Sequence, residues 1–270
     1  MNDRANLGST PDALSAMDFQ KLYDEHADYA ARRVEGSFEQ QQIILEVEEF
    51  KIPNLLQLLP DSWLPSSVLE IGCATGELIA RFPVAEGGRR TGVDISPSNI
   101  AVGRARYADV AFYEGDFREL RGERFDVVIM SDVLEHVNDD VGFLRDASEL
   151  AKYVLVNLPL EDNWLNKRRE YGPNDVSGHL RKYCLDQGLG LFESAGLNVL
   201  GYFQVWVHET ELDRKRRRLR RRLLGQAHAG SRSTQLAKAV SISMLRAIGP
   251  IGRHVFASNL FALAHGRSVL

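Results

Sequence analysis

The stretch from Val68 to Leu78 (Val-Leu-Glu-Ile-Gly-Cys-Ala-Thr-Gly-Glu-Leu) constrains the fold of this chain more than any other segment. An apolar run containing Glu70 leads into two glycines, Gly72 and Gly76, and then into an apolar pattern with helical spacing. This order predicts a buried strand, a tight turn and a helix N-terminus, where α/β sheets place nucleotide-like ligands. Glycine has no Cβ, so it lets backbone N–H groups approach such a ligand. The dinucleotide-binding fingerprint has a further glycine, which this turn lacks. The turn therefore predicts a bound ligand but does not identify it as a dinucleotide.

Downstream of the turn, strand patterns alternate with helix patterns. The expected strands are 67–71, 90–95, 110–113, 125–130, 153–158 and 197–207, and the expected helices are 77–82, 98–107, 141–151 and 185–195. The segment 125–130 is nearly all apolar, as a strand buried on both faces should be. This repeated alternation predicts a parallel sheet with helices on both sides.

Upstream of the sheet, two segments with helical spacing cover 18–30 and 38–59. Pro53 lies inside the second segment and requires a break between two shorter helices, because proline disrupts a continuous helix. Two interpretations stay open: these helices cover the ligand site, or they pack on the sheet. Residues 1–17 are polar, and we expect them to be loosely held.

The composition and the charge distribution restrict the cellular setting. The 270 residues are 44% hydrophobic and 26% charged, which is ordinary for one large globular domain with an appendage. Two cysteines, Cys73 and Cys184, match neither a disulfide framework nor a zinc motif. The sequence contains no recognisable signal peptide and no apolar run that could span a bilayer, so we expect a cytoplasmic protein.

A net charge of −4 conceals an asymmetry along the chain. Residues 211–270 carry 13 basic and 2 acidic side chains, whereas residues 1–210 carry 20 basic and 35 acidic ones. Eight of the nine positions in 214–222 are Arg or Lys, and such a run predicts an anionic partner. Apolar residues with helical spacing follow it, and no aromatic residue that could stack on bases occurs in 207–255. This pattern favours an anionic membrane surface or a lipid-linked substrate over nucleic acid.

The glycine turn resembles motif I of the class I S-adenosylmethionine (SAM) dependent methyltransferases, in their small-molecule branch. Asp94 ends the second strand pattern 22 residues after Gly72, near the separation of about 20 at which an acid meets ribose hydroxyls. Asp116 follows the third strand pattern; the matching acid of the family binds the adenine amino group, and the next residue, here Phe117, packs on the ring. The segment 131–137 (Ser-Asp-Val-Leu-Glu-His-Val) resembles motif IV, which lines the methyl end of SAM.

The resemblance implies an α/β, Rossmann-like fold with a seven-stranded, mostly parallel sheet whose antiparallel last strand lies beside the fifth. The apolar run 257–264 fits that strand. We therefore expect an N-terminal helical cap (1–60), a SAM-binding core (61–210), a basic helical insertion (211–256) and the final strand of the core (257–270). The cofactor-binding residues that the resemblance implies are Glu70, Gly72, Cys73, Ala74, Gly76, Asp94, Ile95, Asp116, Phe117 and Ser131.

The resemblance also implies methyl transfer from SAM, with S-adenosylhomocysteine as the product. A hydroxyl acceptor must be aligned and must lose its proton. His179, in the long polar connection 161–182, is our preferred base because imidazole titrates near neutral pH and this loop faces the strand ends. His136 has more of a pocket-shaping role in this interpretation, and Asp132 and Glu161 are weaker candidates.

The acidic residues near motif IV (Asp132, Asp139, Asp140 and Asp162) form no recognisable ligand set, so we predict that the reaction needs no metal. The leading hypothesis is O-methylation of a small-molecule, sugar or lipid-linked glycan hydroxyl in a biosynthetic pathway. One alternative is an RNA or protein methyltransferase that docks its substrate on 214–222. Another is a membrane-associated SAM-binding scaffold without catalysis. The sequence leaves the acceptor, the regiochemistry and the oligomeric state open.

Overall fold

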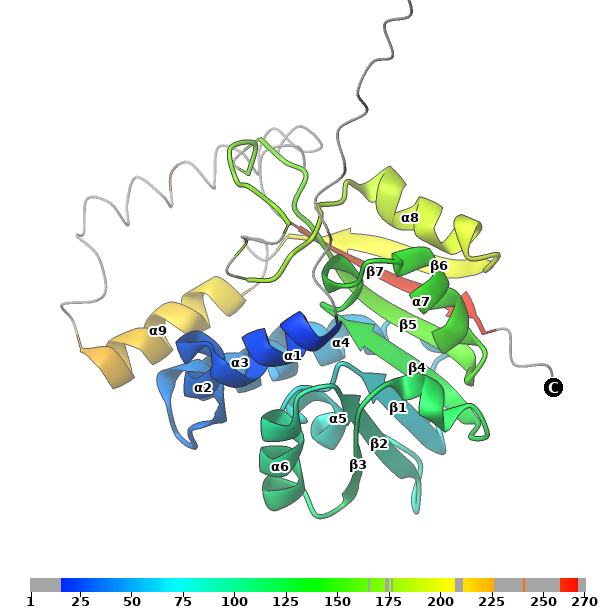
Figure 1. Ribbon diagram of the computed structural model, residues 1–270, viewed down its shortest axis with the longest axis horizontal. Coiled ribbons are helices and arrows are strands. Elements are labelled where there is room, and N and C mark those ends of the chain that lie inside the picture. The colour runs from blue at the N-terminus through cyan, green and yellow to red at the C-terminus, as the bar shows by residue number, and fades with distance from the viewer. Residues whose placement is uncertain are drawn as a thin grey trace, which may run out of the picture.

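A seven-stranded sheet forms the centre of the molecule (Figure 1). The structure is a computed structural model that describes residues 16–164, 166–172, 175, 177–206, 211–225, 240 and 258–266. The strands are β1 (Ser67–Ile71), β2 (Arg89–Asp94), β3 (Val110–Glu114), β4 (Phe125–Ser131), β5 (Ala151–Leu160), β6 (Val199–Val205) and β7 (Ser258–His265). Their order is β3-β2-β1-β4-β5-β7-β6, and β7 runs antiparallel to both of its neighbours. The predicted fold class is confirmed, including the antiparallel last strand beside the fifth.

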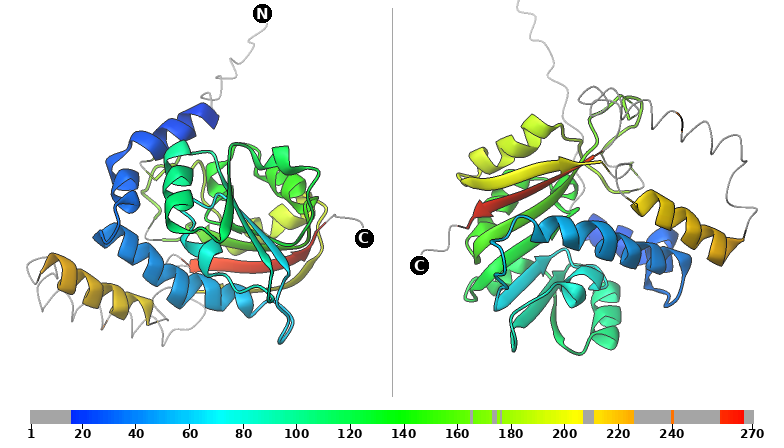
Figure 2. Two further views of the ribbon diagram at one scale, coloured as in Figure 1. Left: turned by 90° about the horizontal axis from the view of Figure 1, so that it is seen from below. Right: turned by 180° about the vertical axis from the view of Figure 1, so that it is seen from behind.

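Helices cover both faces of this sheet (Figures 1 and 2). They are α1 (Ala16–Glu25), α2 (Ala27–Arg33), α3 (Phe38–Glu46), α4 (Ile52–Leu56), α5 (Glu77–Arg81), α6 (Pro97–Arg106), α7 (Asp140–Ser148), α8 (Leu185–Ser194) and α9 (Leu212–Leu224). Successive side chains of a strand point to opposite faces. Val128 and Met130 of β4 therefore pack toward α7 and α8, whereas Val127 and Ile129 pack toward α4, α5 and α6.

A wide helical turn interrupts the second N-terminal segment near Pro53. Helix α3 passes into a π-helical turn, Val47–Lys51, and α4 then begins with Pro53 in its first turn, where a missing N–H is tolerated. The expected break is therefore only a local widening, because the backbone keeps right-handed helical angles at both junctions, Val47 and Lys51. Phe50 of the turn is buried with its ring edge-on to Phe261 of β7, at 5.4 Å between centroids. Lys51, the next residue, reaches the carboxyl end of β4.

The sequence left open whether the N-terminal helices cover the ligand site or pack on the sheet, and the structure shows helices in both positions. Helices α3 and α4 pack on a face of the sheet, whereas α1 and α2 contact residues at the carboxyl ends of the strands. Asp24 of α1 accepts hydrogen bonds from Ser96 Oγ (2.5 Å) and from the Ser98 N–H (3.3 Å). Tyr29 of α2 donates from its hydroxyl to the carbonyl of Ser177 (3.0 Å). Helices α1 and α2 therefore bridge the β2–α6 junction and the long connection after β5.

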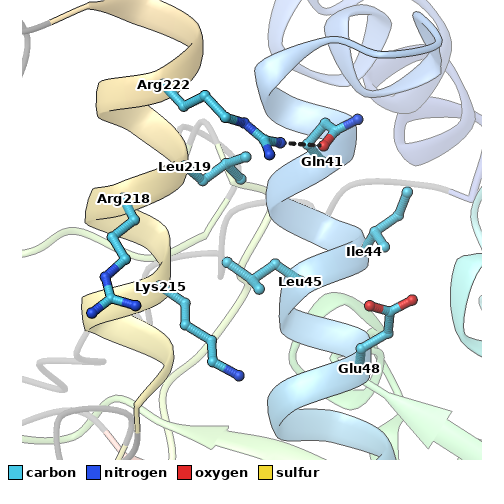
Figure 3. A pocket seen from close by; sticks show the side chains of 8 residues that line it. All are labelled: Gln41, Ile44, Leu45, Glu48, Lys215, Arg218, Leu219 and Arg222. Atoms are coloured by element: carbon cyan, nitrogen blue, oxygen red, sulfur yellow. Dashed lines mark hydrogen bonds between the residues drawn. The ribbon is translucent and has the colours of Figure 1, made fainter.

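The basic run 214–222 lies in helix α9, which packs along α3 (Figures 1 and 3). Four of its cations pair with acids of the same chain. Lys215 and Arg216 pair with Glu49 and Glu46 of the preceding helical segment, and Arg214 and Arg217 pair with Glu211 and Asp213 beside them. A hollow between the two helices is lined by Gln41, Ile44, Leu45, Glu48, Lys215, Arg218, Leu219 and Arg222, and none of these lies at a strand end (Figure 3). Acidic side chains of the same chain therefore supply part of the negative charge that we expected from a partner.

Several predictions concern residues that the structure leaves undescribed. These are the loosely held N-terminus up to residue 15, the apolar helical pattern in 226–255 apart from Val240, and position 257 of the last strand. In the described ranges, no helix combines the length and the apolar character needed to cross a bilayer.

Candidate active site

The glycine turn between β1 and α5 is held in a conformation that favours glycine. Gly72 and Gly76 have φ angles of 73° and 88°, and Ala74 also adopts a positive φ, 47°. A Cβ on Gly76 would lie 2.5 Å from Cζ of Phe112, and one on Gly72 would lie 2.7 Å from Cγ2 of Val133. The glycines are therefore required both by the backbone and by close packing against β3 and the segment after β4.

Two buried carboxylates fix this turn to the sheet. Glu70 accepts a hydrogen bond from the Ile79 N–H (2.9 Å), and Asp94 accepts from the Ala74 N–H (2.8 Å) and the Ser96 N–H (2.9 Å). Burial raises the pKa of Glu70 to about 8, partly offset by Lys51. Burial also raises the pKa of Asp94, against the hydrogen bonds that it accepts. Burial disfavours the charged form of both carboxylates. A ligand that brings positive charge or hydroxyl donors would stabilise that charged form.

The other predicted cofactor-binding residues differ in exposure. The Asp116 carboxylate is half exposed and accepts from the Arg118 N–H (2.9 Å), while the Phe117 ring is buried against Phe143, at 4.7 Å between centroids. Cys73 is buried against Gly92 of β2, and its N–H donates to the carbonyl of Val93 (3.1 Å). Ile95, next to Asp94, is partly buried. These residues surround the ends of β1, β2 and β3, where the sequence placed them.

A polar network closes the end of β4. Asp132 has a φ of 58°, a strained angle for a residue with a side chain. Its carboxylate lies 2.6 Å from Nζ of Lys51 and accepts from Asn157 Nδ2 (3.3 Å), while Ser131 Oγ donates to it (3.2 Å). Burial lowers the pKa of Lys51, but Asp132 and Glu46 outweigh burial, and the net shift is upward. Lys51 and Asn157 were not predicted, because their partners are distant in the sequence.

His179 is oriented by a carboxylate. Its Nδ1 lies 2.6 Å from Oε2 of Glu161, and Arg169 donates to the other oxygen of Glu161 (2.7 Å). Arg169 also pairs with Asp175 (2.9 Å). Burial raises the pKa of Glu161, but the bonds from His179 and Arg169 reverse the shift, so this carboxylate is ionised and can only accept. Nδ1 of His179 therefore donates to Glu161, so Nε2 is the nitrogen that would accept a proton in the neutral imidazole.

His136 stands edge-on to His179, with the ring centroids 4.8 Å apart. Its Nδ1 lies 3.0 Å from the carbonyl oxygen of Gly178, which only accepts, so Nδ1 donates and Nε2 keeps a lone pair. Burial and the neighbouring His179 lower the pKa of His136 to about 4. His136 is consequently neutral at pH 7, and the structure brings the two candidate bases together.

Glu135 is a site residue that the sequence analysis did not single out. Its side chain is 1% exposed, and neither carboxylate oxygen has a hydrogen-bond partner among the residues that the structure describes. Burial, and then the charge of Asp132, raises the pKa of Glu135. The sequence does show an acidic residue directly before His136 and just after a strand. It does not show that this residue lies beside His179, which is distant in the sequence.

Residues 43–201 match a family described as a methyltransferase domain. A ubiquinone biosynthesis O-methyltransferase of Methylobacterium nodulans is 40% identical over 93 residues, covering 32% of this chain and 36% of that protein. A protein of the same name from Bradyrhizobium diazoefficiens is 29% identical over 172 residues, covering 54% of this chain and 67% of that protein. The chain thus spans about a third of the length of the first curated relatives that it matches.

Solved structures with the same fold have low sequence identity to this chain. The [4+2]-cyclase SpnF has a TM-score of 0.53 at 16% identity, covering 91% of this chain and 87% of its own. Magnesium protoporphyrin IX methyltransferase of Synechocystis PCC 6803, crystallised with SAH, has a TM-score of 0.51 at 14% identity, covering 92% and 93%. Because one of these is named as a cyclase, the likeness establishes the fold and leaves the reaction to be argued from the site.

Proposed function

Because this chain belongs to the SAM-dependent methyltransferase family, we propose that it transfers a methyl group from SAM to a hydroxyl of a small molecule. The observation that carries the proposal is the His179–Glu161 pair, which leaves one imidazole nitrogen ready to accept a proton at the carboxyl edge of the sheet. The curated relatives support a hydroxyl acceptor, since they are named as O-methyltransferases. The acceptor itself, including a sugar or a lipid-linked glycan, is part of the proposal.

The residues at the ends of β1, β2 and β3 fit SAM. Asp94 uses part of its acceptor capacity on backbone amides and can still accept from ribose hydroxyls, since a carboxylate has about four lone-pair sites. Glu70 is a buried acid whose charged form gains from a nearby cation, and Asp116 is exposed for an adenine amino group. When bound, SAM supplies a methyl group on a positively charged sulfur.

The residues of this chain would align the acceptor and move its proton. Glu161 holds the His179 ring, and Arg169 holds Glu161, so Nε2 is presented in one orientation. The hydroxyl proton passes to Nε2 of His179, and the oxygen lone pair forms the bond to the methyl carbon. The electron pair of the broken carbon–sulfur bond remains on sulfur. His136, neutral and perpendicular to His179, shapes the pocket in this scheme.

The test uses purified protein, SAM labelled in its methyl group, and three probe acceptors: catechol, phenol and aniline. We expect label in a hydroxyl product, and a loss of about 10²–10⁴-fold in kcat for His179→Ala. His265→Ala is the matched control, because His265 lies at the opposite end of β5, paired with Tyr153. Label in aniline alone would overturn the hydroxyl assignment, and an unchanged kcat in His179→Ala would overturn the base.

Contact of the basic helix with an anionic membrane is a separate part of the proposal. Four cations of the helix pair with acids of this chain. Arg218 and Arg221, in contrast, are exposed, and no carboxylate lies within salt-bridge distance of them in the described ranges. The exposed arginines support a surface-lying role for α9. No contact in the described ranges favours docking of RNA or protein on the same run.

A further inference from the structure

A line of alternating charges connects the basic helix α9 to the end of β4. Arg216 of α9 pairs with one carboxylate oxygen of Glu46, and Nζ of Lys51 lies 3.8 Å from the other oxygen. The same Nζ lies 2.6 Å from the carboxylate of Asp132. We propose that Lys51 is a positioning residue for the reaction, and that Arg216 controls it through Glu46. The catalytic meaning of this inference rests on the proposed function, whereas the contacts themselves do not.

The backbone at Asp132 is held in a conformation that needs support from its surroundings. Its φ of 58° lies in the left-handed region, which is strained for a residue with a Cβ. The Asp132 N–H donates to the carbonyl of Asn157 (3.0 Å), and the Asn157 side chain donates to the Asp132 carboxylate (3.3 Å). Among the described residues, Lys51 supplies the one cation within salt-bridge distance of this carboxylate. The ion pair therefore helps to hold the chain where it leaves β4.

The segment that follows Asp132 contacts both sides of the proposed reaction site. Val133 packs against Gly72 of the glycine turn, and His136 stands edge-on to His179. The His136 N–H donates to the carbonyl of Val133 (3.0 Å), so these two residues belong to one tight turn. A change of chain direction at Asp132 would move both contacts together. A misplacement of about 1 Å can cost about 100-fold in rate, so this direction matters for kcat.

Lys51 reaches Asp132 from a fixed position at the end of the π-helical turn. Phe50, directly before it, is buried in the core, which anchors the backbone of the turn. The Lys51 side chain is only 16% exposed. Burial lowers the pKa of Lys51, but Asp132 and Glu46 outweigh burial, and the net shift is upward. Both acids therefore stabilise the charge of this ammonium group.

Glu46 is shared between Lys51 and a cation that lies 170 positions further along the chain, Arg216. The guanidinium of Arg216 holds one oxygen in a hydrogen bond, whereas Lys51 lies beyond hydrogen-bonding distance of the other. Removing the charge of Arg216 would leave Lys51 as the one cation within salt-bridge distance of Glu46 in the described ranges. Coulomb attraction would then draw the Lys51 ammonium toward Glu46 and away from Asp132.

The alternative is that the pair of Arg216 with Glu46 only docks α9 onto the preceding helical segment. The neighbouring pair of Lys215 with Glu49 joins the same two parts of the chain. In the described ranges, Glu49 lies within salt-bridge distance of Lys215 alone, so this pair has no connection to Lys51. If docking were the whole role of these pairs, loss of either one would have the same effect at the end of β4.

Hydrogen exchange of the full-length protein, followed by mass spectrometry, tests the connection without reference to activity. The readout is the exchange rate of the amides in residues 131–137. We expect exchange at least about 5-fold faster in Arg216→Gln, because local opening becomes easier when the support of Asp132 weakens. Adding Glu46→Gln to this variant removes the acid that draws Lys51 away, so the rate should return to within about 2-fold of the wild type. Glu49→Gln is the matched control and should exchange as the wild type does.

The outcomes that would overturn the connection are specific. Unchanged exchange in Arg216→Gln would exclude control through Glu46. Fast exchange that persists in the double variant, or that Glu49→Gln reproduces, would show a docking effect instead. Because Lys51→Met also weakens the fold as a whole, the decisive variants are those of Arg216 and Glu46, which leave Lys51 in place.

Kinetics with labelled SAM then separate this inference from the proposed function. We expect kcat for the hydroxyl acceptor to fall by about 3–10-fold in Arg216→Gln and to recover in the double variant. KM for SAM should change by less than about 2-fold, because alignment is altered and cofactor binding is not. Faster exchange with an unchanged kcat would overturn the positioning role and leave the methyltransferase proposal intact. If the wild type methylates no hydroxyl acceptor, the proposed function is wrong, and the exchange rates still decide whether the charges are connected.

Discussion

Replacing Glu135 by Met should stabilise the folded protein. The substitution removes a buried carboxylate that lacks a hydrogen-bond partner in the described ranges, and it keeps the length of the side chain. An unsatisfied buried polar group costs about 1–3 kcal/mol, and this cost is absent from the variant. For a chain of this size, 1 kcal/mol corresponds to about 2–4 °C in Tm, so we expect Tm to rise by about 2–12 °C.

Differential scanning calorimetry of the wild type and the variant measures this effect. Glu193→Met, on the exposed face of α8, is the matched control and should stay within about 0.5 kcal/mol. A lower Tm for Glu135→Met would refute the reasoning, because it would show that the carboxylate has a stabilising partner.

Three further predictions follow from the charges around the site. Glu70 has a folded-state pKa of about 8 against 4.5, so the folded state holds its proton longer, and stability should fall as pH rises from about 4.5 to 8. This loss is on the order of 5 kcal/mol at most, and Glu70→Gln should flatten the dependence of Tm on pH. Lys51→Met leaves Asp132 unpaired at a strained φ and should destabilise the protein by about 2–3 kcal/mol in urea unfolding. The protein should float with phosphatidylserine vesicles at low salt and not with phosphatidylcholine vesicles, and Arg218→Glu with Arg221→Glu should abolish flotation; equal flotation of this variant would exclude α9 as the contact.

The sheet could be predicted because its signals are local. The apolar run 125–130 forms β4, and the glycines at 72 and 76 do adopt positive φ angles. Gly196 likewise ends α8 with a φ of 73°, as the helical pattern before it indicates. Each of these features depends on a few neighbouring residues, whose periodicity and conformational freedom can be read from the sequence.

The charge pairs could not be predicted, because they join distant segments. Arg216 meets Glu46, 170 positions earlier, only because α9 packs along α3. Lys51 reaches Asp132 because the chain widens into a π-helical turn, which sequence patterns do not indicate. The basic run was therefore interpreted as lacking an anion, although part of that anion lies in the same chain.

The segment 131–137 joins the two halves of the proposed reaction site. Val133 lies so close to Gly72 that a Cβ on that glycine would be 2.7 Å away, so the segment abuts the glycine turn of the proposed SAM site. Two residues later, Glu135 and His136 face His179 at the proposed acceptor site. The positive φ of Asp132, held by Lys51 and Asn157, sets the direction in which the segment leaves β4. The 3₁₀ turn from Leu134 to His136 connects Val133 to the acceptor side, so a displacement at the glycine turn should reach His136 through this segment. On the proposed function, the placement of the methyl donor relative to the acceptor therefore depends on one short segment, whose strained residue, Asp132, directly follows a buried strand.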